Sequence, residues 1–379
     1  MEFVLNKRDF VRGLSRVQAV ADKKSTMAIL MNVLIAADSS GSVRLAATDL
    51  LLSVTGTLRA DVRKGGSVAL PARHVFEIVK TLPEGEVTVT VAQNYSARIR
   101  GGKRRFDLVG MPGEDFPSLP EIGKVPMVSV PVDDLGDLIA LTSFSMSTDD
   151  TRPHLSAALF EMSGDTLRMV TTDGHRLSKA ERKIPGMSAS NKLLIPARSI
   201  HELKRVVDEA HAEKSERKDT GPVTIAVGAA TSQGPVFFQR DGMTLSSKLV
   251  DAAFPSYEQV IPTGTDRTVE LSRPGLLDAL RAVSLVAADR TSGVKLQMSG
   301  SRVVVSSDNP DVGAGMDEID ADLTGDDLTI GFNSKYVIDV LSALSSDRVA
   351  LDLSGELDPG LIRPVGRDDF IGVIMPMRI

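Results

Sequence analysis

The fold is decided by the stretch Leu167-Arg168-Met169-Val170-Thr171-Thr172-Asp173, an apolar strand-like segment that ends in a hydroxyl residue and an aspartate. The same pattern occurs earlier as Val43-Arg44-Leu45-Ala46-Ala47-Thr48-Asp49 and later as Val303-Val304-Val305-Ser306-Ser307-Asp308. A second landmark follows the aspartates after 22, 23 and 23 residues, as Pro71-Ala72-Arg73, Pro196-Ala197-Arg198 and the divergent Gly331-Phe332-Asn333. Similarity at a fixed long period indicates that one structural unit is used repeatedly. The chain therefore contains three copies of one unit.

The three copies differ in length. The aspartates of successive copies lie 124 and then 135 residues apart, and a third landmark, Phe116-Pro117, returns as Phe254-Pro255 after 138 residues. The excess falls around Asp208 to Thr220, a mostly polar and charged stretch that is typical of a surface insertion. We therefore expect three domains, at residues 1–125, 126–262 and 263–379.

Within a copy, the pattern alternates between helix and strand. Strand-like runs in the first copy cover residues 32–37, 43–48 and 51–58, and then 87–92, 96–100 and 106–109. The order helix, three strands, helix, three strands predicts an α+β fold in which each domain is a doubled unit, with helices packed on one face of the sheets. Apolar residues at helical spacing mark the two helices: Phe10, Leu14, Val17 and Ala21, then Val75, Ile78, Val79 and Leu82.

Composition narrows the class of protein. Hydrophobic residues make up 42% and charged residues 25% of the 379 residues, a balance typical of globular proteins. The absence of cysteine excludes disulfides and thiolate chemistry. The five histidines are scattered without metal-site spacing, so we expect no metal and no cofactor. No signal peptide or membrane-length apolar run is visible, so a cytoplasmic protein that does not enter the membrane is expected.

Charge limits the ways in which the chain can bind nucleic acid. The net charge of −6 argues against a protein that coats nucleic acid, and 4% aromatic residues argue against a single-strand binder. However, Arg8, Arg12 and Arg16 are spaced by four, and residues 7–24 hold six basic and two acidic side chains. Two interpretations remain open: a solvated helix face, or a stripe that contacts phosphates without regard to sequence.

The strongest catalytic candidate is Asp173-Gly174-His175-Arg176, with Ser178 as the nucleophile. Against it, Asp49 and Asp308 occupy the equivalent positions without any histidine. An aspartate at the end of a strand commonly bonds its own backbone in a turn. We therefore expect no catalytic residue. The segment Gly174-His175-Arg176-Leu177 is found in the middle copy alone. It therefore favours a binding site in that copy over an idiosyncratic loop.

These motifs resemble the bacterial DNA sliding clamp, the β subunit of DNA polymerase III, and the resemblance covers the chain end to end. It implies a non-catalytic processivity factor with the DNA clamp fold: three similar domains, each with two helices and antiparallel sheets. It also implies that two subunits join head to tail in a six-domain ring around duplex DNA. The segments that carry it are Thr172 to Leu177, Ser247-Lys248-Leu249-Val250-Asp251, Phe254-Pro255, Ile330 to Asn333, Asp115-Phe116-Pro117 and the terminal Val373-Ile374-Met375-Pro376-Met377-Arg378-Ile379.

The resemblance implies a pocket for partner peptides between the second and third domains. Leucine, valine, proline and methionine suit varied apolar peptide side chains. The expected partners are the polymerase III catalytic subunit, the clamp loader, repair polymerases, mismatch repair proteins and ligase. Gln259 stands where many relatives have arginine. The implied pocket residues are Leu155, Thr172, Gly174, His175, Arg176, Leu177, Pro255, Val260, Val373, Met375, Pro376, Met377 and Arg378.

The resemblance also assigns DNA-facing and subunit-contact residues. Lys24, Arg73 and Arg198 match inner-surface positions, and Arg152 lies in a loop, Arg152-Pro153-His154, where many relatives carry paired tyrosines. Phe106 and Leu108 match a subunit contact opposite Leu285 and Val286.

Two other classes of protein remain open: a hydrolase centred on His175, and a monomeric repeat adaptor that binds proteins only. A duplicated paralogue of the housekeeping clamp would show nearly the same sequence features.

Overall fold

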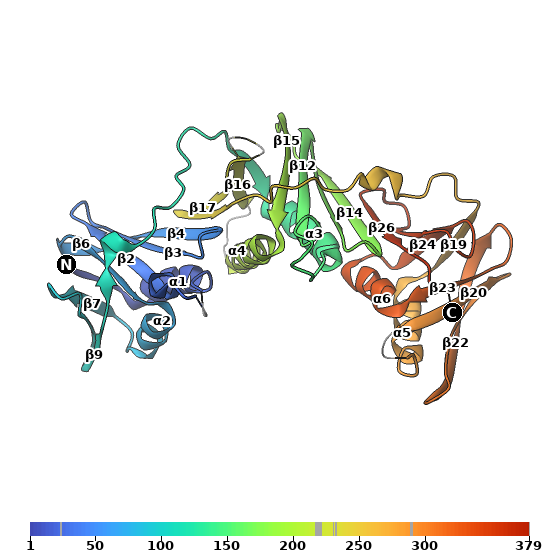
Figure 1. Ribbon diagram of the computed structural model, residues 1–379, viewed down its shortest axis with the longest axis horizontal. Coiled ribbons are helices and arrows are strands. Elements are labelled where there is room, and N and C mark those ends of the chain that lie inside the picture. The colour runs from blue at the N-terminus through green and yellow to red at the C-terminus, as the bar shows by residue number, and fades with distance from the viewer. Residues whose placement is uncertain (23–24, 217–221, 230, 232, 289–290, 379) are drawn as a thin grey trace. The chain divides into compact units, whose positions relative to one another are not determined.

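The structure is a computed structural model that describes residues 1–22, 25–216, 222–229, 231, 233–288 and 291–378. Lys24 lies outside these described residues. The chain forms two compact units: one holds residues 1–132 and 201–249, and the other holds residues 133–200 and 250–379. Figure 1 shows the helices and strands of both units with their labels.

Every copy of the repeat follows one order: strand, helix, four strands, helix, three strands, and the first copy adds two short strands. The first copy contains β1 (Glu2–Asn6), α1 (Lys7–Gln18), η1 (Ala28–Met31), β2 (Asn32–Asp38), β3 (Ser42–Thr48), β4 (Leu52–Arg59), β5 (Asp61–Lys64), β6 (Gly66–Pro71), α2 (Ala72–Thr81), β7 (Glu86–Val91), β8 (Ala97–Gly101), β9 (Arg104–Leu108), β10 (Met111–Pro112) and η2 (Gly113–Asp115).

The middle copy contains β11 (Val128–Pro131), α3 (Val132–Thr142), η3 (Ser143–Ser145), β12 (Ala157–Gly164), β13 (Thr166–Thr172), β14 (Arg176–Lys183), β15 (Ala189–Pro196), α4 (Ala197–Glu216), β16 (Thr224–Ala229), β17 (Val236–Arg240), β18 (Met243–Ser247) and η4 (Tyr257–Gln259). The third contains β19 (Arg267–Ser272), α5 (Arg273–Val283), β20 (Gly293–Ser299), β21 (Arg302–Asn309), β22 (Gly313–Thr324), β23 (Leu328–Asn333), α6 (Ser334–Ala343), β24 (Arg348–Leu353), β25 (Gly360–Pro364) and β26 (Phe370–Ile374).

The sheets join strands from neighbouring copies. The first unit has a five-stranded sheet, β5-β1-β7-β8-β9, and a nine-stranded sheet, β10-β6-β2-β3-β4-β18-β17-β16-β11. The second unit has a twelve-stranded sheet, β15-β12-β13-β14-β26-β25-β24-β19-β22-β21-β20-β23. In the nine-stranded sheet β4 of the first copy pairs with β18 of the middle copy, and in the twelve-stranded sheet β14 of the middle copy pairs with β26 of the third. The halves of the middle copy therefore belong to different units.

The repeat landmarks mark where strands turn into helices. Pro71 precedes α2, and Asn333 precedes α6, where its side-chain oxygen accepts a hydrogen bond from Lys335 N at 3.0 Å. Asn6 starts α1 in the same way, accepting from Arg8 N at 2.9 Å. These side chains satisfy amide groups that have no partner inside the helix.

The expected pattern was correct in type but incomplete. Both helices of the first copy and its six expected strands are present. The prediction of six strands per copy was wrong, because one further strand directly precedes each helix, such as β1 before α1 and β6 before α2. Ala21 is buried but lies beyond the end of α1 at Gln18. The inserted stretch lengthens α4 to 20 residues, against 10 in α2 and in α6, and α4 ends at Glu216. Residues 217–220, the end of the inserted stretch, lie outside the described ranges.

Candidate partner-binding site

The segment from Thr172 to Leu177 forms a hydrogen-bonded turn between β13 and β14. Asp173 Oδ1 accepts hydrogen bonds from the amides of His175 at 2.9 Å and Arg176 at 3.1 Å. Thr172 Oγ1 accepts from Gly174 N at 3.1 Å and donates to Arg176 O at 2.6 Å. Gly174 has a φ of 93°, a conformation that glycine adopts without steric cost.

The first copy contains the same turn at the equivalent position. Asp49 Oδ1 accepts from Leu51 N at 2.9 Å and Leu52 N at 2.7 Å, and Thr48 Oγ1 donates to Leu52 O at 2.9 Å. Leu50, with a φ of 76°, stands where the middle copy has glycine. The expected structural role is therefore confirmed for Asp49 and Asp173. Asp308, at the third equivalent position, instead lies inside β21, opposite Ala314 in the β21–β22 ladder.

The geometry argues against the hydrolase alternative. Ser178 is fully buried, and its hydroxyl lies 2.8 Å from that of Ser145. His175 is exposed on the turn, and Asp173 bonds backbone amides and Arg176. A nucleophile that solvent cannot reach has no access to a substrate.

Arg176 connects the turn to the third copy. Its guanidinium donates to Asp173 Oδ2 at 3.1 Å, to Asp339 Oδ2 at 2.5 Å and to Phe144 O at 2.6 Å. It also lies 4.5 Å from the centre of the Tyr336 ring. Only 11% of the Arg176 side chain is exposed. The guanidinium thus holds the site together and presents little surface to a ligand.

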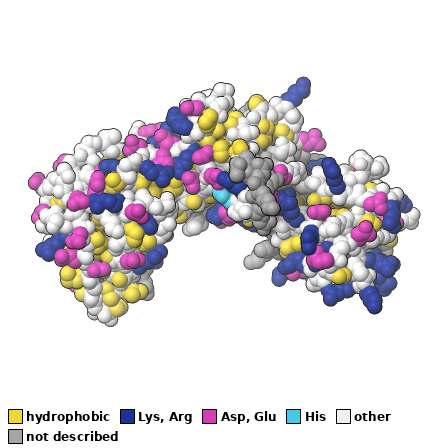
Figure 2. Space-filling model, turned by 180° about the vertical axis from the view of Figure 1, so that it is seen from behind, with side chains coloured by type: hydrophobic (Ala, Val, Ile, Leu, Met, Phe, Trp, Pro, Cys, Tyr) yellow, Lys and Arg dark blue, Asp and Glu magenta, His cyan; other side chains and the backbone are white. Residues whose placement is uncertain are grey.

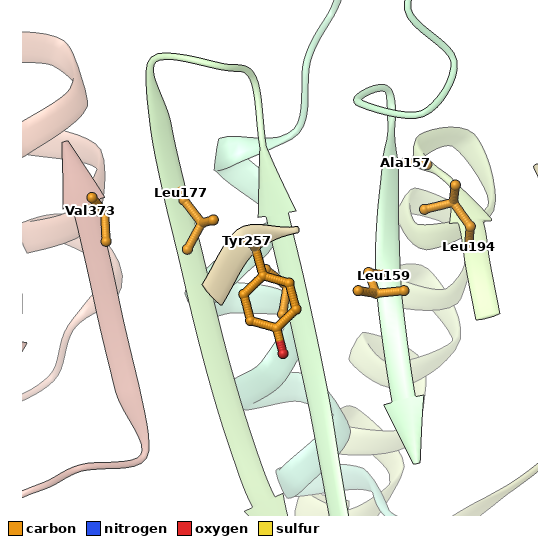
Figure 3. Packing of buried hydrophobic residues seen from close by; sticks show 7 residues of the cluster. Ala157, Leu159, Leu177, Leu194, Tyr257 and Val373 are labelled. Carbon is orange, nitrogen blue, oxygen red and sulfur yellow. The ribbon is translucent and has the colours of Figure 1, made fainter. Parts of the chain in front are cut away.

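An apolar cluster lies beside this turn. Figure 3 shows the Tyr257 ring between Leu177 and Leu159, with Val373 on the strand next to Leu177. Leu177 and Val373 are opposite each other in the β14–β26 ladder. The predicted residue Leu155 is buried, Val260 is half-buried and Pro255 is exposed. The cluster comprises Ala157, Leu159, Val170, Leu177, Leu194, Tyr257 and Val373, with Val250, Phe254 and Ile261 packed against it.

Sequence reasoning missed the residues that form most of this cluster. Ala157 and Leu159 alternate along β12, and Leu194 lies opposite Leu159 on β15. The continuous apolar run at residues 157–160 could have indicated a buried strand, but it carries no sign of which ligand lies next to it. Tyr257 lies three residues beyond the Phe254 landmark.

The residues after β26 bond first to the turn and then to β23. Met375 N donates to His175 O at 2.9 Å, and Met377 N donates to Gly331 O at 2.8 Å. Met375 and Arg378 are exposed, whereas Pro376 and Met377 are half-buried. In the first unit, Lys248 N donates to Leu51 O at 2.8 Å, which is the equivalent bond after β18. The two junctions between copies are therefore built alike.

The residues assigned to DNA lie in different surroundings. Arg73 on α2 and Arg198 at the start of α4 are exposed. Arg152 donates to Asp149 Oδ2 at 3.0 Å and to Asp173 O at 3.4 Å, so it lies against the turn at Asp173. Figure 2 shows acidic side chains interspersed with the Lys and Arg side chains over the visible face.

The arginines of the first helix differ in their surroundings: the Arg8 side chain is 84% exposed, as expected of a solvated face, whereas Arg12 and Arg16 pair with α4. Arg16 Nε donates to both oxygens of Glu209 on α4 at 2.9 and 3.0 Å, and Arg12 Nε donates to Glu209 Oε1 at 3.2 Å. Glu213 also pairs with Arg12 and Arg240. Burial acts to raise the pKa of Glu209, but the hydrogen bonds from Arg16 and Arg12 outweigh it and lower the pKa. Arg12 and Arg16 thus join α1 to α4, because the inserted turns of α4 bring carboxylates to them. Arg8 instead pairs with Glu84 at 3.2 Å.

The predicted subunit-contact residues lie at sheet edges or helix ends. Phe106 and Leu108 are half-buried on β9, the last strand of the five-stranded sheet. Leu285, after α5, is 82% exposed. A Cβ built at Gly315 of β22 would lie 2.9 Å from Val286 Cγ2, so Val286 packs closely on that strand.

The described residues offer neither a metal site nor a membrane span. Among them, no group of three or more His, Asp or Glu side chains is placed to hold a metal ion. No helix in the same ranges is long and apolar enough to cross a membrane.

The comparisons with known proteins cover the whole chain. Three family descriptions match in order: DNA polymerase III beta subunit, N-terminal domain, at residues 1–120; central domain, at 129–256; and C-terminal domain, at 258–378. The chain is 30% identical over 381 residues to the beta sliding clamp of Pseudomonas putida, with 100% of both chains covered.

Solved structures match as fully. Two similar structures are sliding clamps bound to griselimycin, from Pseudomonas aeruginosa at 29% identity and a TM-score of 0.91, and from Bartonella birtlesii at 33% identity and a TM-score of 0.90. Each match covers 100% of both chains.

Proposed function

Because the chain belongs to the family of DNA polymerase III β subunits, the bacterial sliding clamps, we propose that two copies close into a ring around duplex DNA. The family consists of non-catalytic processivity factors of the polymerase. In the proposed function, the ring tethers the replicative polymerase to DNA by encirclement and does no chemistry.

Two strands support the proposed ring. Each is equivalent to a strand that joins neighbouring copies, but the described residues show no such junction for either of them. β4 pairs with β18, and β14 pairs with β26. The strand equivalent to β4 and β14 in the third copy is β22, whose residues 313–320 pair with β21, while its pairing with β19 begins at Ala321. The strand equivalent to β18 and β26 in the first copy is β9, at the edge of its sheet. The next junction of this kind therefore needs β9 from a second copy.

Pairing between β9 of one copy and β22 of the other would be head to tail, and two such junctions close a ring. Exposed strand edges commonly carry charged side chains, and β9 and β22 carry them too, but exposed apolar side chains lie on or beside both strands. Met316 on β22 is 69% exposed, Leu285 is 82% exposed and Val109, next to β9, is 84% exposed. Burying them beside Phe106, Leu108 and Val286 gives the junction an apolar core.

DNA would be held by sequence-independent attraction to phosphates. Arg73 and Arg198 are exposed, as such contacts require, and we propose them as DNA-facing together with Arg152 and Lys24. We leave Arg12 and Arg16 out of this group because they pair with carboxylates of α4. Weak, non-specific attraction permits sliding, since no single contact must be broken at high cost.

We propose that partner peptides bind at the apolar cluster beside the Thr172–Leu177 turn. The site would include Leu155, Leu177, Pro255, Val260 and Val373, with Met375 to Arg378 from the tail. Solvent-accessible methionine beside buried leucine and valine suits extended apolar peptides. We infer that griselimycin, which is bound to the similar clamps of Pseudomonas and Bartonella, binds here as well.

The proposed partners are those named by the family resemblance: the polymerase catalytic subunit, the clamp loader, repair polymerases, mismatch repair proteins and ligase. Domain boundaries near residues 125 and 262 and a cytoplasmic location belong to the same proposal.

Two measurements test this function. Sedimentation equilibrium should give about twice the chain mass of 40.5 kDa, whereas a monomeric adaptor gives that mass itself at every concentration. Leu177→Asp should abolish griselimycin binding, because it places a charge in the buried cluster. Unchanged binding by this variant would place the ligand elsewhere.

A further inference from the structure

A row of alternating charges crosses the sheet next to the apolar cluster. Lys192, Glu161, Arg168 and Glu181 lie directly opposite one another on β15, β12, β13 and β14. Lys192 Nζ is 2.6 Å from Glu161 Oε1, and Arg168 is 3.1 Å from Glu161 Oε2 and 3.0 Å from Glu181 Oε2. Glu161 is 4% exposed, so its charge is stabilised by these partners rather than by water.

Tyr257 spans the boundary between this row and the cluster. Its ring packs among the apolar residues, with Phe254 edge-on at 6.4 Å. Its hydroxyl donates to Glu161 Oε2 at 2.8 Å and accepts from Arg168 at 3.3 Å. Burial and the bond to Glu161 raise the pKa of the hydroxyl, so it keeps the proton that it donates. The side chain therefore has one favourable depth and one favourable direction on the sheet.

The segment that carries Tyr257 depends on this anchor. The segment is tied to the sheet at its start by the bond from Val250 N to Leu194 O at 2.9 Å. Further on, Gln259 N and Val260 N bond within η4, to Ser256 O and Tyr257 O. These local bonds fix the shape of η4 but not its place on the sheet. Pro255 and Val260 flank this short helix, and their neighbours Phe254 and Ile261 also pack on the cluster. Because apolar packing has little directional preference, the hydroxyl bonds of Tyr257 are what fix the position of both residues on the sheet.

We propose that Tyr257, held by Glu161 and Arg168, is a positioning residue for the partner site, so that peptide affinity depends on charges that the peptide does not touch. This inference rests on the proposed peptide pocket. If the hydroxyl bond is lost, the ring can slide on the cluster and the wall formed by Pro255 and Val260 is no longer fixed. The peptide must then order that wall as it binds, which reduces the net binding free energy.

The test compares Tyr257→Phe with wild type and with Tyr95→Phe, a matched loss of a hydroxyl far along the sequence in the first copy. Griselimycin affinity should fall about tenfold in Tyr257→Phe, equivalent to about 1.4 kcal/mol, and stay unchanged in Tyr95→Phe. Hydrogen exchange should quicken at the amides of Gln259 and Val260 and stay the same in β12 and β13. Faster exchange throughout the second unit would mean a general structural role and would overturn the proposal.

A second variant covers the case in which Tyr257→Phe does not fold. Glu161→Gln keeps an acceptor for the hydroxyl but leaves Arg168 and Lys192 unbalanced, and it should weaken binding in the same direction. Wild-type affinity in both variants would overturn the positioning role alone. Failure of the wild-type protein to bind griselimycin would instead overturn the pocket, and this inference with it.

Discussion

The repeated turn allows a single bond pattern to be tested in two places within one chain. Asp173→Ala removes the acceptor of the His175 and Arg176 amides and a partner of the Arg176 guanidinium. Asp49→Ala removes the same pair of amide bonds, to Leu51 and Leu52, in the first copy. Both turns should loosen, but only the turn at Asp173 lies at the proposed partner site.

The magnitude follows from the bonds that are lost. Because water can hydrate the freed amides, the two lost bonds are taken at about 1 kcal/mol each, or about 2 kcal/mol together. Because each compact unit is in the range of 150–250 residues, either variant should lower the Tm of its own unit by roughly 4–8 °C. The loosened turn at Asp173 must be ordered again when the ligand binds. Griselimycin affinity should therefore drop about tenfold, equivalent to about 1.4 kcal/mol.

Calorimetry measures both effects on the same samples. Scanning calorimetry gives the Tm of each variant, and isothermal titration gives the dissociation constant of griselimycin. Asp49→Ala serves as the control that is destabilised without losing affinity. The reasoning fails if both variants lose affinity equally, or if Asp173→Ala keeps wild-type affinity and Tm.

Other outcomes follow from further contacts. Glu209→Gln should lower the free energy of unfolding by about 2 kcal/mol. This value lies between those for exposed and buried ion pairs, because Glu209 and Arg16 are partly exposed. The pKa of Glu209 is lowered from 4.5, so this contribution is present above that pH and is lost as pH falls through the folded-state value. The Tm values of the variant and the wild type should therefore converge at acid pH. A difference in Tm that widens there would contradict the pairing assigned to Glu209. Leu50→Gly should raise stability by up to about 1 kcal/mol, because relief of the strained φ of 76° exceeds the entropy cost of glycine; a lower Tm would oppose this. Phe106→Asp should raise the dimer dissociation constant about 100-fold or more by placing a charge in the β9 junction, and persistent dimers at nanomolar concentration would count against that junction.

The sequence predicted the features that depend on near neighbours. The turn at Asp173 was predicted correctly because its carboxylate bonds amides two and three residues away. The helices were predicted because apolar residues recur at helical spacing. Strands such as β1 and β6 were missed because the last residue of each strand immediately precedes a helix, so no loop separates the two patterns in the sequence.

What was missed depends on residues far apart in the chain. The partner of Arg16 is Glu209, 193 residues away, and a local charge count could not reveal that the stripe on α1 is neutralised. Tyr257 and Glu161 are 96 residues apart, so neither residue indicates the row of charges by itself. The strand order that favours a head-to-tail ring likewise becomes visible only when pairings between copies are known.

Encirclement of DNA is tested most directly by loading the protein onto nicked circular duplex DNA with a clamp loader and then cutting the circle once. A closed ring stays on the circle through washing at high salt and leaves quickly through the new ends after the cut. Retention that is unaffected by the cut but lost in salt would show ordinary electrostatic binding and would contradict the proposed ring.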